Sequence, residues 1–438
     1  MIFIENTPRA YAWGSRDALP ELLGISRTGD PQAELWLGAH PDDPATVAKA
    51  APKGQTLIDL IGRDPERYGV DGGQLPFLLK VLAIGAPLSL QVHPDRAQAE
   101  AGFAAEEAAG VPRDARERNY GDPNHKPELL VALSETTALS GFRPLGEARR
   151  DLAALAAAAP EGAGRSALER AVSCCGEDGE DPERSRREFM AWALGGGDEA
   201  RRALAAIERI ATGGSADPLP ADVDPHRLDA LRELAAAHPG DPGILVSLLL
   251  HLVRLEPGEA IYLCARQLHA YMSGIAVEVM AASDNVLRAG LTEKHVDVPE
   301  LTRIVDPAEL AEPRIAARAL APGLVAWEPE VPDFRLMRAR LRDPGEGEPE
   351  QGRPFVRDDE RADRVTVDAP YPIVLIVTSG RVRVERRDAE LEEVASVRRG
   401  QSLYVSAGGA IELSGCGEAF LATVGEGWTG VSQPSSAT

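Results

Sequence analysis

The pattern of residue types along the chain changes twice, and these changes are the strongest constraint on its fold. Up to about residue 145, short apolar runs such as LPFLLKVLAIG stand between Gly and Pro, a pattern typical of strands buried on both faces. From residue 146 to 253 the segments are Ala-rich, studded with Arg and Glu, and spaced as helices are. β-Branched and aromatic runs return after residue 254. The sequence therefore predicts a mainly β protein with an inserted α-helical domain.

The positions at which this residue pattern changes set the expected domain boundaries. Asp181-Pro182 and Asp241-Pro242 each offer an N-cap followed by Pro, which favours a helix start at both positions. After an acidic, Pro- and Gly-rich stretch from Asp343 to Asp363, the segments YPIVLIVTSG, RVRVERR, QSLYVSAGG and AFLATVG favour a small β-sandwich or barrel. We predict a core β-domain from residues 1–145 and 254–320, a helical insertion at 146–253, a C-terminal β-domain at 321–430 and a disordered tail at 431–438.

The composition excludes several classes of function. The net charge of −22 disfavours nucleic acid as a partner, because binding its phosphates needs a basic surface. The four cysteines show no CxxC spacing, which indicates a reducing, cytoplasmic setting. The N-terminal residues lack the basic region of a signal peptide, and the longest apolar run, Gly243 to Val253, is too short to span a bilayer. We expect a cytoplasmic monomer without a membrane partner.

Lysine is rare in this chain. The 47 basic residues include only five lysines, namely Lys49, Lys53, Lys80, Lys126 and Lys294. Lys49 and Lys53 lie in a polar stretch and are interpreted as surface residues. Because arginine is the usual cation here, each of the other three is a candidate for a position that needs a compact or tunable ammonium group.

Three segments carry nitrogen and oxygen donors in strand spacing. Gln91 and His93 are separated by one residue, as are Lys126 and Glu128, so each pair would share one face of a strand. His269 begins a third such segment. Donors of this kind are typical of a catalytic zinc site rather than a sulfur-rich structural one. Glu128 is the strongest hint, because a buried carboxylate is costly unless it is paired or metal-bound.

The histidines also have an ordinary interpretation. A single histidine on a strand is usually a hydrogen-bonded structural residue, so spacing alone does not establish a metal site at His93 or His269. We interpret five others as structural or surface residues, of which the first and the last are candidates for a place near the site: His40, His226, His238, His251 and His295.

Five longer segments are distinctive in combination. They are AELWLGAHP (33–41), PFLLKVLAIGAPLSLQVHPD (76–95), NHKPELL (124–130), LHAY (268–271) and VEVMAASDNVLRAGLTEKHVDV (277–298). In this order they resemble the type I phosphomannose isomerases, also called mannose-6-phosphate isomerases. One such segment would be weak evidence for a family, whereas five segments in the same order as in the family are specific evidence. The resemblance runs from the N-terminus to about residue 300.

The resemblance implies a zinc-dependent enzyme that interconverts mannose 6-phosphate and fructose 6-phosphate. It implies a cupin-type β-sandwich or jelly-roll core, with a second, cupin-like β-domain at the C-terminus. The family's active-site arginine falls on Arg288, and the lysines of its substrate pocket fall on Lys80, Lys126 and Lys294. One zinc ion per chain would be bound by Gln91, His93, Glu128 and His269.

Such an isomerase must move a proton between C1 and C2 through an enediolate, which requires a base and a preorganised positive charge. We hypothesise that Lys126 takes part in proton transfer and that Arg288 stabilises the enediolate or holds the phosphate. Glu278 and Asp284 are rival bases. Lys80 also has an ordinary interpretation, as a lysine that reaches solvent from a strand end. The expected substrate contacts are Lys80, Ser89, Tyr271, Glu278, Asp284 and Lys294.

Two other functions stay open. Cupin folds also host iron or manganese oxygenases, and His, Gln and Glu ligands do not exclude those metals. A non-catalytic sugar-binding cupin is the second alternative. No histidine follows His295, so we expect no metal in the C-terminal β-domain.

Overall fold

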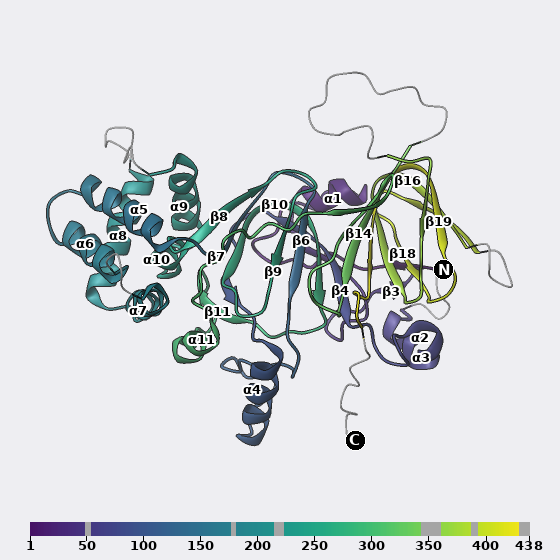
Figure 1. Cartoon of the computed structure of the whole chain (residues 1–438), viewed down its shortest axis with the longest axis horizontal. Coiled ribbons are helices and arrows are strands. Elements are labelled where there is room, and N and C mark those ends of the chain that lie inside the picture. The colour runs from purple at the N-terminus through teal and green to yellow at the C-terminus, as the bar shows by residue number, and fades with distance from the viewer. Residues whose placement is uncertain (49–53, 177–180, 214–222, 343–360, 387–392, 429–438) are drawn as a thin grey trace, which may run out of the picture.

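The computed structural model describes residues 1–48, 54–176, 181–213, 223–342, 361–386 and 393–428. Lys49, Lys53, most of the acidic stretch from Asp343 to Asp363 and the predicted tail lie outside the described residues. The described strands form two sheets that lie side by side, and a block of helices stands at the far end of one of them (Figure 1).

The first sheet lies in the middle of the molecule, between the helical block and the second sheet (Figure 1). Its nine described strands are β2 (Glu34–Leu37), β4 (Phe77–Ile84), β5 (Leu90–Val92), β6 (Glu128–Ala132), β7 (Thr136–Phe142), β8 (Leu250–Leu255), β9 (Ala260–Leu263), β10 (His269–Ala281) and β11 (Leu287–Gly290). The second sheet has ten described strands: β1 (Ile2–Glu5), β3 (Thr46–Val47), β12 (Arg318–Ala321), β13 (Leu324–Trp327), β14 (Arg335–Leu341), β15 (Arg364–Val367), β16 (Ile373–Arg386), β17 (Glu393–Arg398), β18 (Ser402–Val405) and β19 (Ile411–Thr423). The fold is thus mixed, with a substantial β content.

The helical block is inserted between β7 and β8, which pair antiparallel with each other. It contains α5 (Leu145–Ala158), α6 (Ala163–Cys174), α7 (Pro182–Leu194), α8 (Asp198–Thr212), α9 (Pro225–Ala237) and α10 (Gly243–Ser247). The other described helices are α1 (Ala18–Leu23), α2 (Leu57–Arg63), α3 (Pro65–Tyr68), α4 (Arg96–Ala108) and α11 (Val298–Ile304). None of the described helices is both long and apolar enough to cross a membrane.

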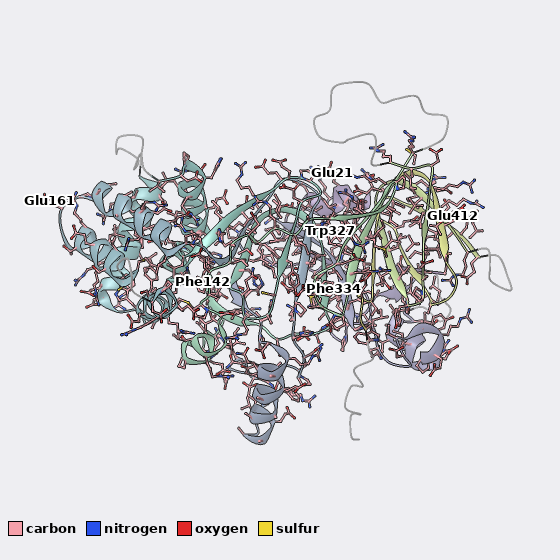
Figure 2. All side chains as sticks on the ribbon, in the orientation of Figure 1. Glu21, Phe142, Glu161, Trp327, Phe334 and Glu412 are labelled. Atoms are coloured by element: carbon pink, nitrogen blue, oxygen red, sulfur yellow. The ribbon has the colours of Figure 1, made fainter. Side chains whose placement is uncertain are left out.

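The nine-stranded sheet is packed against a different core on each side. On β4, Leu79 points into the core between the two sheets, where Trp327 and Phe334 also lie (Figure 2). Phe142 belongs to a second core, which joins the helical block to strands β5, β7, β10 and β11. The other residues of β4, such as Leu82, face neither of these two cores. Together with residues of β6, β8, β9 and β10 they line a third cluster of buried side chains, called here the third region. The alternation expected of doubly buried strands therefore sets which side chains enter this third region.

The N-terminal strand belongs to the second sheet. β1 pairs antiparallel with β18, with Ile2 opposite Tyr404 and Ile4 opposite Ser402, and also with β3. The predicted division of the chain, which placed residues 1–145 in one core domain, does not follow the sheets here. The reason is tertiary pairing across almost the whole chain, which no local pattern reveals.

One predicted helix start is confirmed and one is wrong. Asp181 accepts hydrogen bonds from two amides of the first turn of α7, as an N-cap does. Asp241 is not the N-cap of α10, which begins at Gly243 after Pro242. Its carboxylate instead accepts from the amides of Gly243 and Leu291, both at 2.7 Å, and so ties the helical block to the end of β11.

Two elements differ from the secondary structure that the sequence pattern predicts. The segments YPIVLIVTSG and RVRVERR form one continuous strand, β16, because Gly380 adopts a left-handed φ of 69° where a side chain would collide with the backbone of Cys416. Helix α4 lies within the part of the chain read as strands. Its signal was present in the sequence, since Asp95 and Gln98 form a capping box at its start.

Leu79→Ala tests the core between the sheets. Leu79 is fully buried there, so we expect the substitution to lower the free energy of unfolding by about 2–5 kcal/mol, measured by chemical denaturation. Ile25, which is 49% exposed, supplies the control, and Ile25→Ala should change the free energy by less than about 0.5 kcal/mol. Equal effects of the two substitutions would show that this core does not stabilise the fold.

Candidate active site

Three neighbouring strands turn charged side chains into the third region. β10 pairs with β4 and β6, and the register places Glu278 opposite Lys80 on one side and Leu130 on the other. Directly opposed residues share a face of the sheet, and Glu128, two residues before Leu130, points the same way. The alternate residues of these strands fill the core between the sheets. Packing of that core therefore fixes the register that brings the charges together.

A second set of strands supplies further polar side chains. Gln91 on β5 lies in register between His269 on β10 and Arg288 on β11. Their neighbours along the strands, Leu90 and Leu287, pack in the core against the helical block. The side chains of Gln91, His269 and Arg288 therefore share the face that is turned away from the helices.

His93, Glu128 and His269 form a buried cluster whose ligand atoms lie within 4.8 Å of one another. Each histidine Nε2 lies 3.4 Å from a Glu128 oxygen, and neither Nε2 has a hydrogen-bond partner among the described residues. The other ring nitrogens are engaged: Nδ1 of His93 donates to the carbonyl oxygen of Asn285 at 2.6 Å, and Nδ1 of His269 to that of Gln267 at 3.0 Å. Both rings are thereby held with Nε2 free to bind. Buried nitrogen and oxygen atoms without hydrogen-bond partners are suited to bind a cation such as zinc.

The charges around this cluster favour the ionisation states that a metal needs. Burial alone would raise the pKa of Glu128, but Lys126, whose Nζ lies 3.1 Å from Oε1, holds it well below the usual range. Burial lowers the pKa of His93 to about 4, although the charge of Glu128 opposes this. A carboxylate and a neutral imidazole are therefore the resting forms, so metal binding at neutral pH releases no proton from either.

Lys80 is a buried cation held by carboxylates. Its Nζ lies 3.3 Å from Glu278, 3.9 Å from Glu34 and 4.8 Å from the ring centre of Trp36. Burial alone would lower the pKa of Lys80, but Glu34, Glu278 and Glu128 together raise it. The interpretation of Lys80 as a lysine reaching solvent from a strand end is wrong, because it lies in the middle of β4, which is covered on both faces. Its contact with substrate stays a prediction.

Tyr271 and Glu278 complete this polar layer. The Tyr271 hydroxyl donates a hydrogen bond to Glu278 at 2.9 Å, and both residues are buried. Burial, reinforced by the charge of Glu128, raises the pKa of Glu278, and burial next to Glu278 raises the pKa of Tyr271. Lys80 and Tyr271 thus occupy the two oxygens of Glu278. The predicted roles of Tyr271 and Glu278 as substrate contacts, and of Glu278 as a rival base, are not tested by these contacts.

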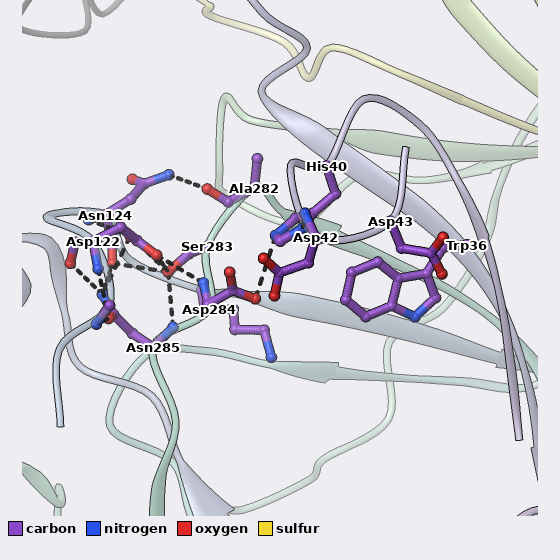
Figure 3. A network of polar contacts seen from close by, with 12 residues as sticks. Trp36, His40, Asp42, Asp43, Asp122, Asn124, Ala282, Ser283, Asp284 and Asn285 are labelled. Atoms are coloured by element: carbon purple, nitrogen blue, oxygen red, sulfur yellow. Dashed lines mark hydrogen bonds and ion pairs between the residues drawn. The ribbon is translucent and has the colours of Figure 1, made fainter. Parts of the chain in front are cut away.

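A hydrogen-bond network around Asn285 holds the loop that follows β10 (Figure 3). The Asn285 amide donates to the backbone oxygens of Asp122 and Asn124, both at 2.7 Å, and the Ser283 hydroxyl donates to the Asp122 carboxylate at 2.9 Å. The network ties this loop to the segment before β6, and it fixes the backbone oxygen that holds the ring of His93. Sequence reasoning identified neither Asp122 nor Asn285, although the segment VEVMAASDN contains the latter.

Asp284 lies on the exposed side of this network. Its side chain is 47% exposed, and its carboxylate lies 3.3 Å from Nε2 of His40. Figure 3 marks this contact with a dashed line. Burial alone would raise the pKa of Asp284, but the hydrogen bond from His40 lowers it. Nδ1 of His40 accepts from the amide of Asp42 at 3.3 Å, which leaves Nε2 as the donor to Asp284. Of the two histidines considered for a place near the site, His40 is there, whereas His295 is exposed.

A contact from the second sheet lies beside Lys126. Nε2 of His125 is 2.9 Å from the carboxylate of Asp333, which lies between β13 and β14 and is 2% exposed. Arg96, at the start of α4, is 3.6 Å from the other oxygen of the same carboxylate. The second sheet thereby contacts the residue next to Lys126. Nothing in the sequence pattern signalled Asp333.

The remaining predicted residues lie nearer the surface. Arg288 is half-buried, burial lowers its pKa, and its guanidinium forms no ion pair with any described residue. Lys294 is exposed, and its pKa is lowered by partial burial and by the charge of Arg288. Ser89 directly precedes β5 instead of lying in it, so the strand pleat does not set its orientation relative to Gln91. Gln91 as a ligand, and Ser89, Arg288 and Lys294 as substrate contacts, stay predictions.

A double-sheet fold with an inserted helical block and a buried His–Glu–His cluster defines a β-rich protein with a candidate metal site. Residues 1–145 match the family model described as phosphomannose isomerase type I, catalytic domain. The chain is 42% identical over 302 residues to the mannose-6-phosphate isomerase of Escherichia coli K12, covering 68% of this chain and 72% of the relative. It is 30% identical over 438 residues to that of Schizosaccharomyces pombe, covering 94% and 95%. The chain belongs to the type I phosphomannose isomerase family, which confirms the resemblance found in its five segments.

Solved structures extend the likeness to nearly the whole chain. A mannose 6-phosphate isomerase with zinc bound aligns at a TM-score of 0.79 and 32% identity, covering 97% of this chain and 99% of the other. The apo form from Salmonella typhimurium aligns with the same score, identity and coverage. The agreement therefore includes the helical block and the second sheet.

The lowered pKa of His93 predicts a pH dependence of stability in the metal-free chain. The folded chain keeps His93 neutral down to about pH 4, whereas the unfolded chain protonates it near pH 6.5, so the unfolded state binds more protons between these values. The stability that His93 contributes is present above pH 6.5 and is lost as the pH falls towards 4. Between pH 7 and pH 5, the wild-type chain should lose about 2 kcal/mol more free energy of unfolding than His93→Gln. An identical loss in both proteins would contradict this assignment.

Proposed function

We propose that this chain interconverts mannose 6-phosphate and fructose 6-phosphate as an isomerase that uses one zinc ion. The names of its relatives, and the zinc bound in one solved relative, support this function. The observation that carries it is the set of buried donor atoms on His93, Glu128 and His269 that lack partners among the described residues. We propose a cupin-type sandwich for the catalytic core, and a second, cupin-like unit at the C-terminus that binds no metal.

The ligand set determines what the metal contributes. His93, Glu128 and His269 would hold the zinc, and Gln91 is the proposed fourth ligand because it lies in register with His269. With one anionic ligand and three neutral ones, bound zinc keeps a positive charge and supplies Lewis-acid stabilisation of the oxygens that become negative in the reaction. A second carboxylate ligand would remove that charge.

Arg288 provides the second positive charge of the proposed site. It lies on the strand next to Gln91, on the same face, and no described carboxylate neutralises it. Arginine keeps its proton, so it can stabilise an enediolate oxygen or bind the phosphate but is a poor base. Lys80 is less available for such contacts, because Glu278 and Glu34 already engage its ammonium group.

Lys126 is the residue to which we assign proton transfer. Conversion of the aldose to the ketose removes the proton from C2 and delivers it to C1. Lys126 is buried, with its Nζ 3.1 Å from Glu128. Zinc bound to Glu128 would take over the charge compensation that the ammonium group supplies in the metal-free chain, which would leave the nitrogen of Lys126 to accept the proton from C2. Asp284 is the rival base, since its half-exposed carboxylate is ionised and is oriented by His40.

A coupled assay for fructose 6-phosphate tests the proposed function. Mannose 6-phosphate should be converted, a chelator should abolish the conversion, and added zinc should restore it. Unphosphorylated mannose, run in parallel, should react far more slowly because Arg288 and the nearby lysines have no phosphate to bind. Absence of conversion in the zinc-loaded chain, or dependence on a redox-active metal instead, would leave the oxygenase or sugar-binding alternative.

Lys126→Ala tests the assigned base. Loss of a positioned proton-transfer group should lower kcat by about 100-fold or more. Lys126→Arg is the matched control, because it keeps the charge next to Glu128 but cannot act as a base at neutral pH. Both variants should be compared at equal zinc content. If kcat of Lys126→Ala stays near that of the wild type and only KM rises, Lys126 binds substrate and does not transfer the proton.

A further inference from the structure

A cavity of about 840 Å³ lies in the helical block, away from the proposed metal site. It is lined by residues of α5, α9 and β8 and by Arg143 at the end of β7, and it shares no lining residue with the candidate active site. Its volume falls within the range of small-molecule sites, which is about 300–1,000 Å³. Nothing in the proposed isomerase reaction uses it.

Arg227, which projects from α9 into this cavity, is a buried cation without an acidic partner. Only 6% of the residue is exposed. Its guanidinium donates to the backbone oxygens of Ser247 at 3.3 Å and Leu250 at 3.0 Å, and it forms no ion pair with any described carboxylate. A guanidinium has five N–H donors, so the described chain satisfies only part of its capacity.

Arg143 adds a second buried guanidinium to the same cavity. It pairs with Asp151 at 2.6 Å, whereas Arg227 forms no ion pair with that carboxylate. Burial and the charge of Arg143 lower the pKa of Arg227 to about 9, although the charges of Asp151, Asp224 and Glu147 oppose this from a distance, without an ion pair. Burying such a charge without a counter-ion is costly. Arg227 is therefore a buried cation without a directly contacting counter-ion, and an anion in contact with its guanidinium would stabilise it.

The other polar residues of the lining leave the guanidinium of Arg227 without a direct acidic partner. Arg150 is exposed and pairs with no described carboxylate, whereas Nε2 of His251 is engaged by the backbone oxygen of Leu310 at 2.6 Å. Two acids also line the cavity. Asp224 is exposed and caps α9 by accepting from the amide of residue 226, and Glu147 is half-buried without a described ion pair.

We propose that this cavity binds a small phosphorylated metabolite, with its phosphate against Arg227 and Arg150. Guanidinium groups match phosphate oxygens in geometry and charge, which favours phosphate over a single carboxylate. The cavity wall also includes Ala153, Ala154 and Leu252, which offer an apolar surface to the remainder of the ligand. The site would be separate from the one that binds the sugar substrate.

Equilibrium dialysis of the zinc-loaded full chain with radiolabelled inorganic phosphate tests this site. The wild type should bind two phosphates, one here and one at the proposed active site. Arg227→Met and Arg288→Met should each bind one. Retention of both phosphates by Arg227→Met overturns the cavity proposal, whereas retention of both by Arg288→Met counts against the proposed substrate site alone.

Two further measurements keep the test decisive. Arg227→Met should leave isomerase turnover unchanged, and phosphate should raise the melting temperature of the wild type more than that of the variant. If Arg227→Met does not fold, Arg150→Gln replaces it, since Arg150 is exposed. That variant should bind phosphate at this site at least about 10-fold more weakly. Unchanged affinity in Arg150→Gln would overturn the proposal.

Discussion

The buried charge of Glu128 is the constraint around which the rest of the site is arranged. A carboxylate that is 2% exposed is unstable unless positive charge or a metal compensates it. Lys126 supplies that charge at 3.1 Å, and the rings of His93 and His269 face it at 3.4 Å. Lys80 extends the same layer by adding a second buried ammonium group. Because Glu128 and the lysines compensate opposite charges, removal of Glu128 or of either lysine takes a partner from a charge that stays buried, so the charged residues of this layer depend on one another.

Period-two alternation explains why two distant parts of the chain are needed for one site. The strands around Lys80 and Glu128 send their alternate residues into the core between the sheets. The strands that carry His269 and Arg288 send theirs into the core against the helices. A slip of one residue in β4 would exchange Lys80 with Leu79 and place an ammonium group in an apolar core. The second sheet and the helical block therefore hold the site in register without contributing a residue to the cluster of His93, Glu128 and His269.

The sequence predicts those parts of the site that depend on strand alternation and on family segments. Lys126 contacts Glu128, although it precedes β6 instead of sharing a strand face with Glu128, and the helical insertion follows from composition alone. Contacts between residues far apart in the sequence cannot be predicted from local patterns. Asp333 lies 208 positions from His125 in the sequence, and no pattern near either residue predicts their contact. Asp241 shows the opposite error, since a good local N-cap signal was overridden by hydrogen bonds to the end of β11.

The pairing of β1 with β18 has a consequence for how the chain folds during synthesis. Residues 2–4 are made about 400 residues before their partners, residues 402–404, emerge from the ribosome. Until then β1 has an unpaired edge and an apolar face without its neighbours, which are features that promote association between chains. Closure of the second sheet is thus a late, non-local step with a high entropic cost. The proposed catalytic sheet, which packs against that closing sheet, gains its full support only after residues 402–404 have been made.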